Sequence, residues 1–268
     1  MKEMVLAGTP GAGKTTLIRG LLQQLKEAVL VDGQVEVPQL WRFFDGEKKT
    51  QETFKVLVPL RNFMLCASCG LCAKNCPFGA IYEEDLWIDP LECEGCGVCA
   101  RNCPQRALQM ANMQVGEWYR LEKDQKILFY GRLLPGAMGG PLLAEHLRRE
   151  AHRLGKPVII EAPGLGESAA RLMDKAEKVV FVLTPETNAL EALERLRTLA
   201  GGARQWLIIN RADQDERVQK RLKDRALETG IELLGEIKDV PPPEKISPES
   251  VAEGFEEVLS RLVVVAKD

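Results

Sequence analysis

Apolar and polar residues form blocks along most of the chain, in the order expected for strands and helices that follow one another. Short runs that are almost entirely apolar occupy residues 4–7, 28–33, 157–164, 178–185 and 205–210. Such runs are typical of parallel strands that are buried on both faces. The segments between them carry apolar residues at helical spacing, as in residues 16–26. The pattern predicts an α/β fold with a doubly wound, mostly parallel sheet.

The alternation of strands and helices stops after the second strand and resumes further along the chain. The segment between holds all eight cysteines, in two similar halves, CASCGLCAKNCPFGAI and CEGCGVCARNCPQRAL. We therefore predict two domains. The larger is a discontinuous α/β domain of residues 1–55 and 114–268, and the smaller is an inserted α+β domain of residues 56–113.

Each half of the inserted segment has the spacing C-x2-C-x2-C-x3-C-P, which is typical of cubane iron–sulfur clusters. Three close cysteines bind one cluster, and the fourth binds the other. The predicted 4Fe-4S ligands are Cys66, Cys69, Cys72 and Cys103 for one cluster and Cys93, Cys96, Cys99 and Cys76 for the other. Two zinc sites are the alternative, but zinc needs only two C-x2-C pairs per site and leaves the third cysteine unexplained. The segment resembles a bacterial 2[4Fe-4S] ferredoxin, which implies electron transfer; a purely structural role for the clusters is the alternative.

A second motif, GTPGAGKT, lies near the start of the chain between a predicted strand and a predicted helix. It fits the G-x4-G-K-T pattern of a phosphate-binding loop, in which glycines let backbone amides face the phosphates. Lys14 is predicted to reach the β and γ phosphates, and Thr15 to bind Mg²⁺. The predicted nucleotide-binding residues of this segment are Gly8, Thr9, Gly11, Ala12, Gly13, Lys14, Thr15 and Thr16.

Further segments are DGQVEVPQL after the second strand, EAPGLGES after a central strand, FVLTPETNALEAL, and LIINRAD followed by ELLGEI. Together with the phosphate loop they resemble the MinD/ParA-type P-loop ATPases. The chain resembles more closely the MinD-superfamily ATPases that contain an inserted ferredoxin domain. The resemblance covers nearly the whole chain and implies ATP as the nucleotide. It also implies a nucleotide-dependent dimer whose switch regions move the ferredoxin domain.

The resemblance implies roles for individual residues. Lys14, Asp32, Gln34 and Glu161 would form the catalytic set, with Asp32 and Gln34 in the first switch and Glu161 meeting Mg²⁺ through water. Two further nucleotide contacts would be Gly164, a hinge near the γ-phosphate, and Asn210, which would recognise the base. Asp213 in NRAD also resembles a guanine-reading pattern, so GTP is the alternative to ATP.

Three positions depart from the family pattern. Thr9 stands where the family has a lysine that reaches the partner's phosphate, Gln34 where it has a carboxylate that aligns water, and Glu161 where it has aspartate. Together they imply slow hydrolysis, or hydrolysis completed by a partner chain that supplies the lysine. The partner could be a second copy or a related ATPase.

Composition and charge indicate which partners and which cellular location to expect for the protein. The 268 residues carry a net charge of −3 with acids and bases interspersed, which gives no basic face for nucleic acid. MKEMVLAG runs directly into the phosphate loop without room for a leader, and no apolar run is long enough to span a bilayer. A final helix from about Pro248 has an apolar stripe that is expected to dock on the core rather than on a membrane. We expect a cytoplasmic protein.

These features predict an ATP-binding iron–sulfur protein with weak ATPase activity. Closure of its dimer would position two 4Fe-4S clusters for electron transfer to a redox partner protein. One alternative is a cluster carrier or scaffold, which four thiolates per cluster disfavour because they hold a cluster tightly. The other is a non-hydrolysing switch subunit of a heterodimer.

Overall fold

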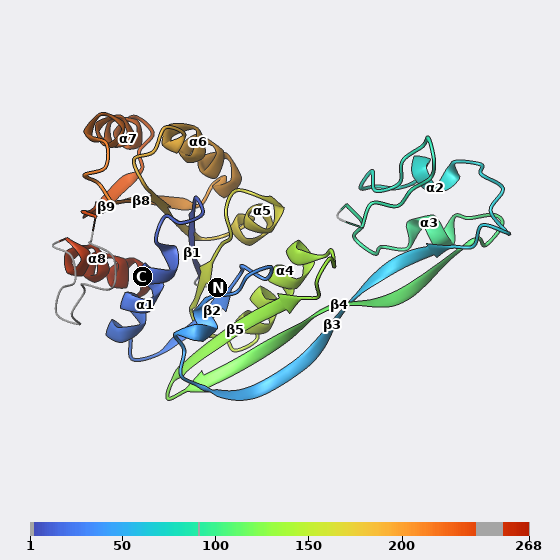
Figure 1. The fold of residues 1–268 in the computed structure, drawn as a ribbon, viewed down its shortest axis with the longest axis horizontal. Coiled ribbons are helices and arrows are strands. Elements are labelled where there is room, and N and C mark those ends of the chain that lie inside the picture. The colour runs from blue at the N-terminus through green and yellow to red at the C-terminus, as the bar shows by residue number, and fades with distance from the viewer. Residues whose placement is uncertain (1–2, 91, 240–253, 268) are drawn as a thin grey trace.

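One sheet runs through the part of the chain that the computed structural model describes, residues 3–90, 92–239 and 254–267 (Figure 1). Its nine strands have the order β3-β4-β5-β2-β6-β1-β7-β8-β9. The strands are β1 (Glu3–Gly8), β2 (Ala28–Asp32), β3 (Glu47–Arg61), β4 (Leu108–Lys123), β5 (Lys126–Leu133), β6 (Val158–Glu161), β7 (Lys178–Leu183), β8 (Arg204–Asn210) and β9 (Glu232–Ile237). The helices are α1 (Lys14–Gln24), α2 (Leu71–Lys74), α3 (Val98–Arg101), α4 (Gly140–His152), α5 (Glu167–Met173), α6 (Ala189–Ala200), α7 (Glu216–Glu228) and α8 (Phe255–Lys267), with a 3-10 turn η1 (Leu40–Arg42).

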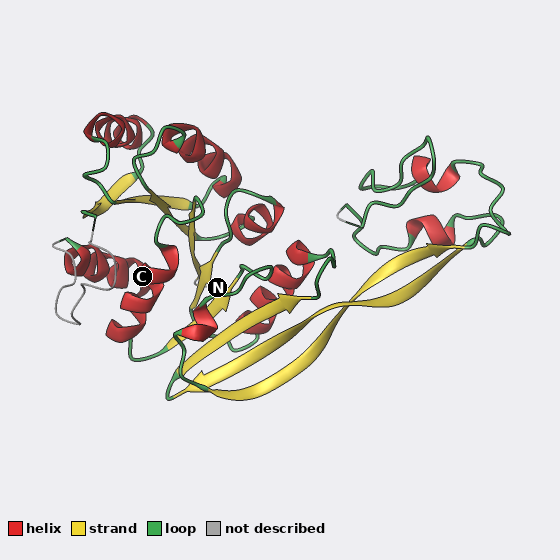
Figure 2. Cartoon of the chain, viewed as in Figure 1, coloured by secondary structure: helices red, strands yellow, loops and turns green. Residues whose placement is uncertain are grey.

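Helices cover both faces of the sheet, and two hydrophobic cores lie between the layers (Figure 2). Side chains of β1 alternate between these cores. Val5 and Ala7 pack with residues of α4 to α7, whereas Met4 and Leu6 pack with residues of α1 and α8. Strands β1, β2, β6, β7, β8 and β9 pair in parallel with their neighbours. The predicted doubly wound, mostly parallel α/β fold is therefore confirmed.

Antiparallel pairing at one edge of the sheet is not predicted by the apolar runs. β4 pairs with β5 from Gly116 to Lys123, and β3 pairs with β4 along almost its whole length. In β3 only Phe54 and Pro59 are buried. An exposed edge strand has no continuous apolar run, which is the signal that marks the buried strands.

The cysteine lobe, residues 62–107, lies at the far end of the ribbon formed by β3 and β4 (Figure 1). It contains the short helices α2 and α3 and a small core of Ala73, Ile81, Leu86 and Cys99, to which Leu108 at the start of β4 also belongs. The predicted domain limits, Val56 and Met113, pair with each other in the ribbon. Both strands therefore run without a break from the main sheet to the edge of the lobe, and the predicted limits fall inside them.

The last helix, α8, packs against α1 and β9 through the buried side chains Val258, Leu259, Leu262 and Val265. Its docking on the core agrees with the prediction from its apolar stripe. The predicted start near Pro248 lies outside the described residues. Within the described ranges, no helix has the length and apolar character that crossing a bilayer requires.

Candidate functional site

The phosphate loop connects β1 to α1 at the edge where the parallel strands end. Gly11 and Gly13 have positive φ angles of 77° and 95°. At Gly8 the backbone of the loop lies close to the backbone of β7, because a Cβ atom added there would lie 2.0 Å from the carbonyl oxygen of Val182. Ala12 N donates to Thr9 O at 3.2 Å and closes the turn. The glycines thus have a steric reason to stand where the motif places them.

The Lys14 side chain is buried inside this loop. Its Nζ donates to the carbonyl oxygens of Gly8 at 3.0 Å and Thr9 at 2.9 Å. Burial lowers the pKa of Lys14, and the carboxylate of Glu161 opposes that shift. A buried cation held by loop carbonyls offers the charge that phosphate recognition needs.

Thr15, Gln34 and Glu161 meet at the start of α1. Oε1 of Glu161 accepts a hydrogen bond from Thr15 Oγ1 at 2.6 Å and another from Gln34 Nε2 at 2.7 Å. Oε2 of Glu161 is buried without a hydrogen-bond partner. A hydroxyl oxygen beside an unpartnered carboxylate oxygen fits the oxygen donors that Mg²⁺ prefers. Thr15 and Glu161 are the residues that would hold Mg²⁺, directly or through water.

Asp32 lies at the end of β2 with its side chain fully buried. Its carboxylate accepts backbone hydrogen bonds from Gln34 (3.1 Å), Gln39 (2.8 Å) and Leu40 (2.9 Å). Burial raises the pKa of Asp32, and these hydrogen bonds oppose that shift. Asp32 therefore fixes the segment that carries Gln34 toward Glu161.

Asn210 and Gly164 approach the loop from two other strands. Asn210 Nδ2 donates to Ala12 O at 2.9 Å. A Cβ atom added at Gly164 would lie 3.3 Å from Pro10 Cγ, so the segment after β6 rests against the loop. The structure thus brings together all the phosphate-loop and switch residues that the sequence predicts.

A pocket beside the loop includes residues outside the predicted set of site residues. Gly11, Gly13, Thr16 and Asn210 line it, together with the additional residues Arg211, Ile237, Lys238, Asp239 and Phe255. Asp213 Oδ1 accepts a hydrogen bond from Asp239 N at 2.7 Å. Arg211 and Ile237 belong to the segments LIINRAD and ELLGEI, but the five added residues share no motif, and only the fold brings them together beside Gly11 and Gly13.

The eight cysteines surround two separate cavities in the lobe. Cys66, Cys69, Cys72 and Cys103 line one, and Cys76, Cys93, Cys96 and Cys99 line the other. These are the two ligand sets predicted from the sequence. Cys69 and Cys96 are exposed residues, so each cavity has one exposed cysteine in its lining.

Four thiols around a cavity fit a 4Fe-4S cluster, because each cysteine binds a different iron of the cube. In the described part of the chain, no three His, Cys, Asp or Glu side chains are grouped as ligands of a single metal ion. Burial raises the pKa of the Cys72, Cys93 and Cys99 thiols. Cluster binding must therefore displace protons from these sulfurs.

Binding of Mg²⁺ with ATP is expected to depend on pH through Glu161. Burial raises the pKa of this carboxyl to about 7. The proton-bound form dominates below that value and disfavours a cation, so affinity should rise about tenfold from about pH 6 to 8 and then level off. Titration with a fluorescent ATP analogue and Mg²⁺ at several pH values measures this.

Glu161→Gln is the matched control, because the amide does not titrate. Its residual pH dependence reports the ionisation of the nucleotide itself. Identical profiles for the wild type and Glu161→Gln would contradict the assigned role of Glu161.

Comparison with known proteins agrees with both parts of the site. The 4Fe-4S binding domain family matches residues 59–82 and 86–109, which contain the eight cysteines. No curated protein matches the sequence significantly.

Several solved structures share the fold over nearly the whole chain. They include the cell division ATPase MinD of Pyrococcus furiosus (16% identity, 98% of each chain covered, TM-score 0.51). A ParA family ATPase from Chlorobium tepidum TLS has 12% identity, covers 99% of this chain and 98% of its own, and has a TM-score of 0.53. A plasmid partition protein of Borrelia burgdorferi B31 bound to AMPPNP has 15% identity, 98% coverage of each chain and a TM-score of 0.50. The chain therefore has the fold of the MinD/ParA-type P-loop ATPases, with a 4Fe-4S binding segment of two repeats inserted into it.

Proposed function

We infer that this chain binds ATP with Mg²⁺ and uses nucleotide-dependent closure of a dimer to position two 4Fe-4S clusters for electron transfer to a partner protein. The observation that carries the proposal is the contact set of Lys14, Thr15 and Glu161 at the phosphate loop. It occurs in the same chain as two cavities with four cysteines each. When bound, the clusters would supply reversible one-electron chemistry.

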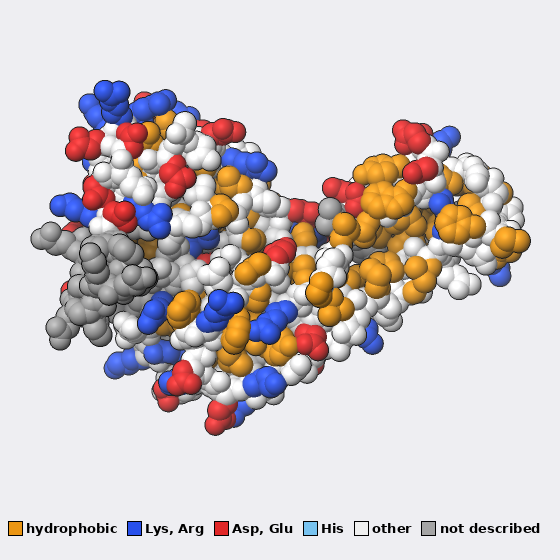
Figure 3. All heavy atoms as spheres, in the orientation of Figure 1, with side chains coloured by type: hydrophobic (Ala, Val, Ile, Leu, Met, Phe, Trp, Pro, Cys, Tyr) orange, Lys and Arg blue, Asp and Glu red, His pale blue; other side chains and the backbone are white. Residues whose placement is uncertain are grey.

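Exposed apolar residues support electron exchange with a protein partner rather than a purely structural role of the clusters. Phe63, Met64 and Leu65, which immediately precede Cys66, are 74%, 93% and 50% exposed. Hydrophobic side chains cover much of the visible face of the lobe (Figure 3). Patches of this kind commonly mark protein contacts. The partner is expected to approach the lobe surface near the exposed residues Cys69 and Cys96.

The hydrolysis residues favour slow turnover in the isolated chain. The Gln34 side-chain amide donates to Glu161 and cannot accept a proton as a carboxylate would. Thr9 supplies a neutral side chain to the loop and contributes its carbonyl oxygen to Lys14. These observations support the non-hydrolysing switch subunit as a second candidate function.

Steady-state ATP hydrolysis by the cluster-loaded protein tests the proposal and separates it from the switch alternative. A positive charge supplied across a nucleotide interface is worth about 10³–10⁵ in rate in other phosphoryl-transfer systems. Wild-type turnover should be slow, and Thr9→Lys should raise it by at least about tenfold, a small part of that range. Thr9→Ser is the control and should remain slow.

ATP binding without turnover in both wild type and Thr9→Lys would favour the switch subunit. Absence of ATP binding would contradict the proposed function. Fast turnover by the wild type, with no gain in Thr9→Lys, would mean that another residue supplies the charge.

A further inference from the structure

Arg171 of α5 connects the ATPase body to the cysteine lobe. Its Nη2 donates to Oε1 of Glu94, which lies between Cys93 and Cys96. The two side chains are 24% and 22% exposed. An ion pair at this depth is less screened by solvent than a surface pair. The contact therefore joins a helix of the body to a loop that lines one cluster cavity.

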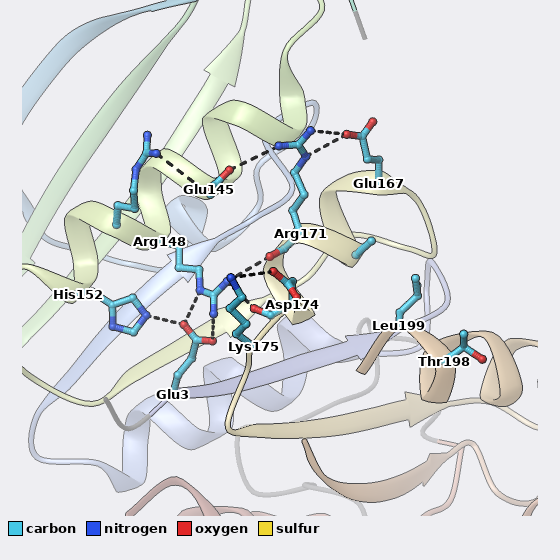
Figure 4. Close-up of a pocket in the computed structure, with 12 residues that line it drawn as sticks. Glu3, Glu145, Arg148, His152, Glu167, Arg171, Asp174, Lys175, Thr198 and Leu199 are labelled. Carbon is cyan, nitrogen blue, oxygen red and sulfur yellow. Dashed lines mark hydrogen bonds and ion pairs between the residues drawn. The ribbon is translucent and has the colours of Figure 1, made fainter. Parts of the chain in front are cut away.

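Arg171 is shared among three carboxylates. Besides Glu94, its Nη2 and Nε bond to Glu167 at 2.8 and 2.9 Å, and its Nη1 lies 3.6 Å from Glu145 (Figure 4). One guanidinium cannot neutralise three acidic side chains. The strength of its bond to Glu94 consequently depends on the positions of Glu145 and Glu167.

The backbone near the C-terminal end of α5 is held in place by Arg148 of α4. Arg148 Nη1 donates to the carbonyl oxygens of Arg171 at 3.1 Å and Asp174 at 3.0 Å. Arg148 also binds the buried carboxylate of Glu3 at 2.7 and 2.8 Å (Figure 4). Movement of α5 is therefore expected to occur mainly at its first turn.

The first turn of α5, which carries Glu167, follows the segment that touches the phosphate loop. That segment, residues 162–166, links Glu161 to α5 and places Gly164 against Pro10. A change in the phosphate loop would reach Glu167 before it reaches the backbone of Arg171. It would thereby change the relative strength of the ion pairs that the Arg171 guanidinium makes with Glu167 and with Glu94.

The ribbon that carries the lobe is only two strands wide beyond its base. β4 pairs with β5 from Gly116 onward, Val115 O accepts one further hydrogen bond from Leu134 N at 2.8 Å, and the part of β4 nearer the lobe pairs with β3 alone. The register shifts at the same level, where Phe54 pairs with Gly116 and Lys55 with Gln114, so Val115 is the extra residue of a bulge. Bulges bend a ribbon, and two-stranded ribbons are weakly stabilised. We therefore expect the lobe to move relative to the body unless a second contact holds it.

The loop that carries Glu94 is packed directly on the ribbon. A Cβ atom added at Gly95 would lie 2.6 Å from the carbonyl oxygen of Leu57. A displacement of the Glu94 side chain is therefore expected to move the ribbon and the neighbouring residues Cys93 and Cys96.

We propose that Arg171 is a positioning residue that couples nucleotide binding to the placement of the loop Cys93–Cys96. It holds the lobe to α5 through Glu94, and nucleotide at the phosphate loop alters this hold through Gly164 and Glu167. The proposal rests on the nucleotide site of the proposed function. It assigns the coupling to a defined ion pair rather than to general flexibility.

Hydrogen exchange of the cluster-loaded protein under anaerobic conditions, with and without Mg²⁺ and AMPPNP, tests this. In the wild type, nucleotide should protect residues 8–16 and change the exchange of residues 93–99. Arg171→Met and Glu94→Gln remove the same ion pair from opposite sides. Both should lose the nucleotide-dependent change at residues 93–99 while keeping the protection at residues 8–16. The iron content of each variant shows whether it retains its clusters. If one of the two variants loses its clusters, the exchange data of the other variant are used to test the proposal.

Arg153→Met is the matched control. Arg153 follows α4, is 73% exposed and pairs with Glu150, which does not contact Arg171, so this variant should behave as the wild type. A change at residues 93–99 that persists in Arg171→Met or Glu94→Gln overturns the inference and leaves the proposed function standing. The same holds if the wild type shows loop protection without any change at residues 93–99. Absence of protection at residues 8–16 contradicts the proposed function itself, and the inference with it.

Discussion

Lys14→Ala is expected to abolish measurable ATP binding while leaving the cluster absorption spectrum unchanged. Hydrogen bonds to charged groups contribute about 1.5–3 kcal/mol each, so loss of two phosphate contacts should weaken binding by at least about a hundredfold. The cysteine ligands lie in the lobe and do not involve the phosphate loop. Titration with a fluorescent ATP analogue measures the affinity, and the visible spectrum of the same sample reports the clusters.

Lys26→Ala is the control for this experiment, since Lys26 is exposed after the end of α1. It should bind ATP as the wild type does. Unchanged affinity in Lys14→Ala would mean that GTPGAGKT is not the nucleotide site.

Protein purified without oxygen is expected to contain about eight iron and eight sulfide per chain, and single cysteine variants about half of each. Removal of one of four thiolates leaves an iron of the cube without its ligand, so Cys76→Ser should lose one cluster and retain the other. Iron and labile-sulfide assays measure the loss. Stoichiometric zinc with negligible sulfide would overturn the cofactor assignment.

A separate experiment tests whether the fourth cysteine of each repeat binds the cluster of the other repeat. Cys76 lines the cavity of Cys93, Cys96 and Cys99, although it belongs to the other repeat in sequence. The EPR spectrum that remains in reduced Cys76→Ser should therefore match that of Cys93→Ser and differ from that of Cys66→Ser. A match with Cys66→Ser would mean that each repeat binds its own cluster.

Most of the sheet could be predicted because buried parallel strands leave a strong signal. β1, β6 and β7 are buried along their whole length, and their apolar runs are interrupted only by one charged residue at an end of each strand, Glu3, Glu161 and Lys178. The ribbon strands β3 and β4 could not be recognised in this way. β3 is exposed along most of its length, and β4 is mostly buried only between Val115 and Leu121, so neither strand has a continuous apolar run. Their pairing is fixed by contacts distant in sequence.

Some residues of the candidate site can likewise be predicted from local sequence, whereas others are recognised only from the fold. Lys14 and Thr15 belong to a contiguous motif, and the cysteine sets follow from regular spacing, so local sequence was sufficient to propose them. The role of Glu161 required a family resemblance. The ion pair of Arg171 and Glu94 joins residues 77 positions apart, and each is an ordinary charged residue in its own segment. Such a contact becomes visible only once the fold brings the two segments together.

A redox titration of the clusters, followed by EPR with and without Mg²⁺ and AMPPNP, tests most directly whether nucleotide and clusters are coupled. Cluster potentials depend on nearby hydrogen bonds, charge and solvent exposure, all of which change if the lobe moves. We expect nucleotide to shift the midpoint potential of at least one cluster and Lys14→Ala to abolish the shift. Potentials that stay the same while the nucleotide is bound would contradict this coupling.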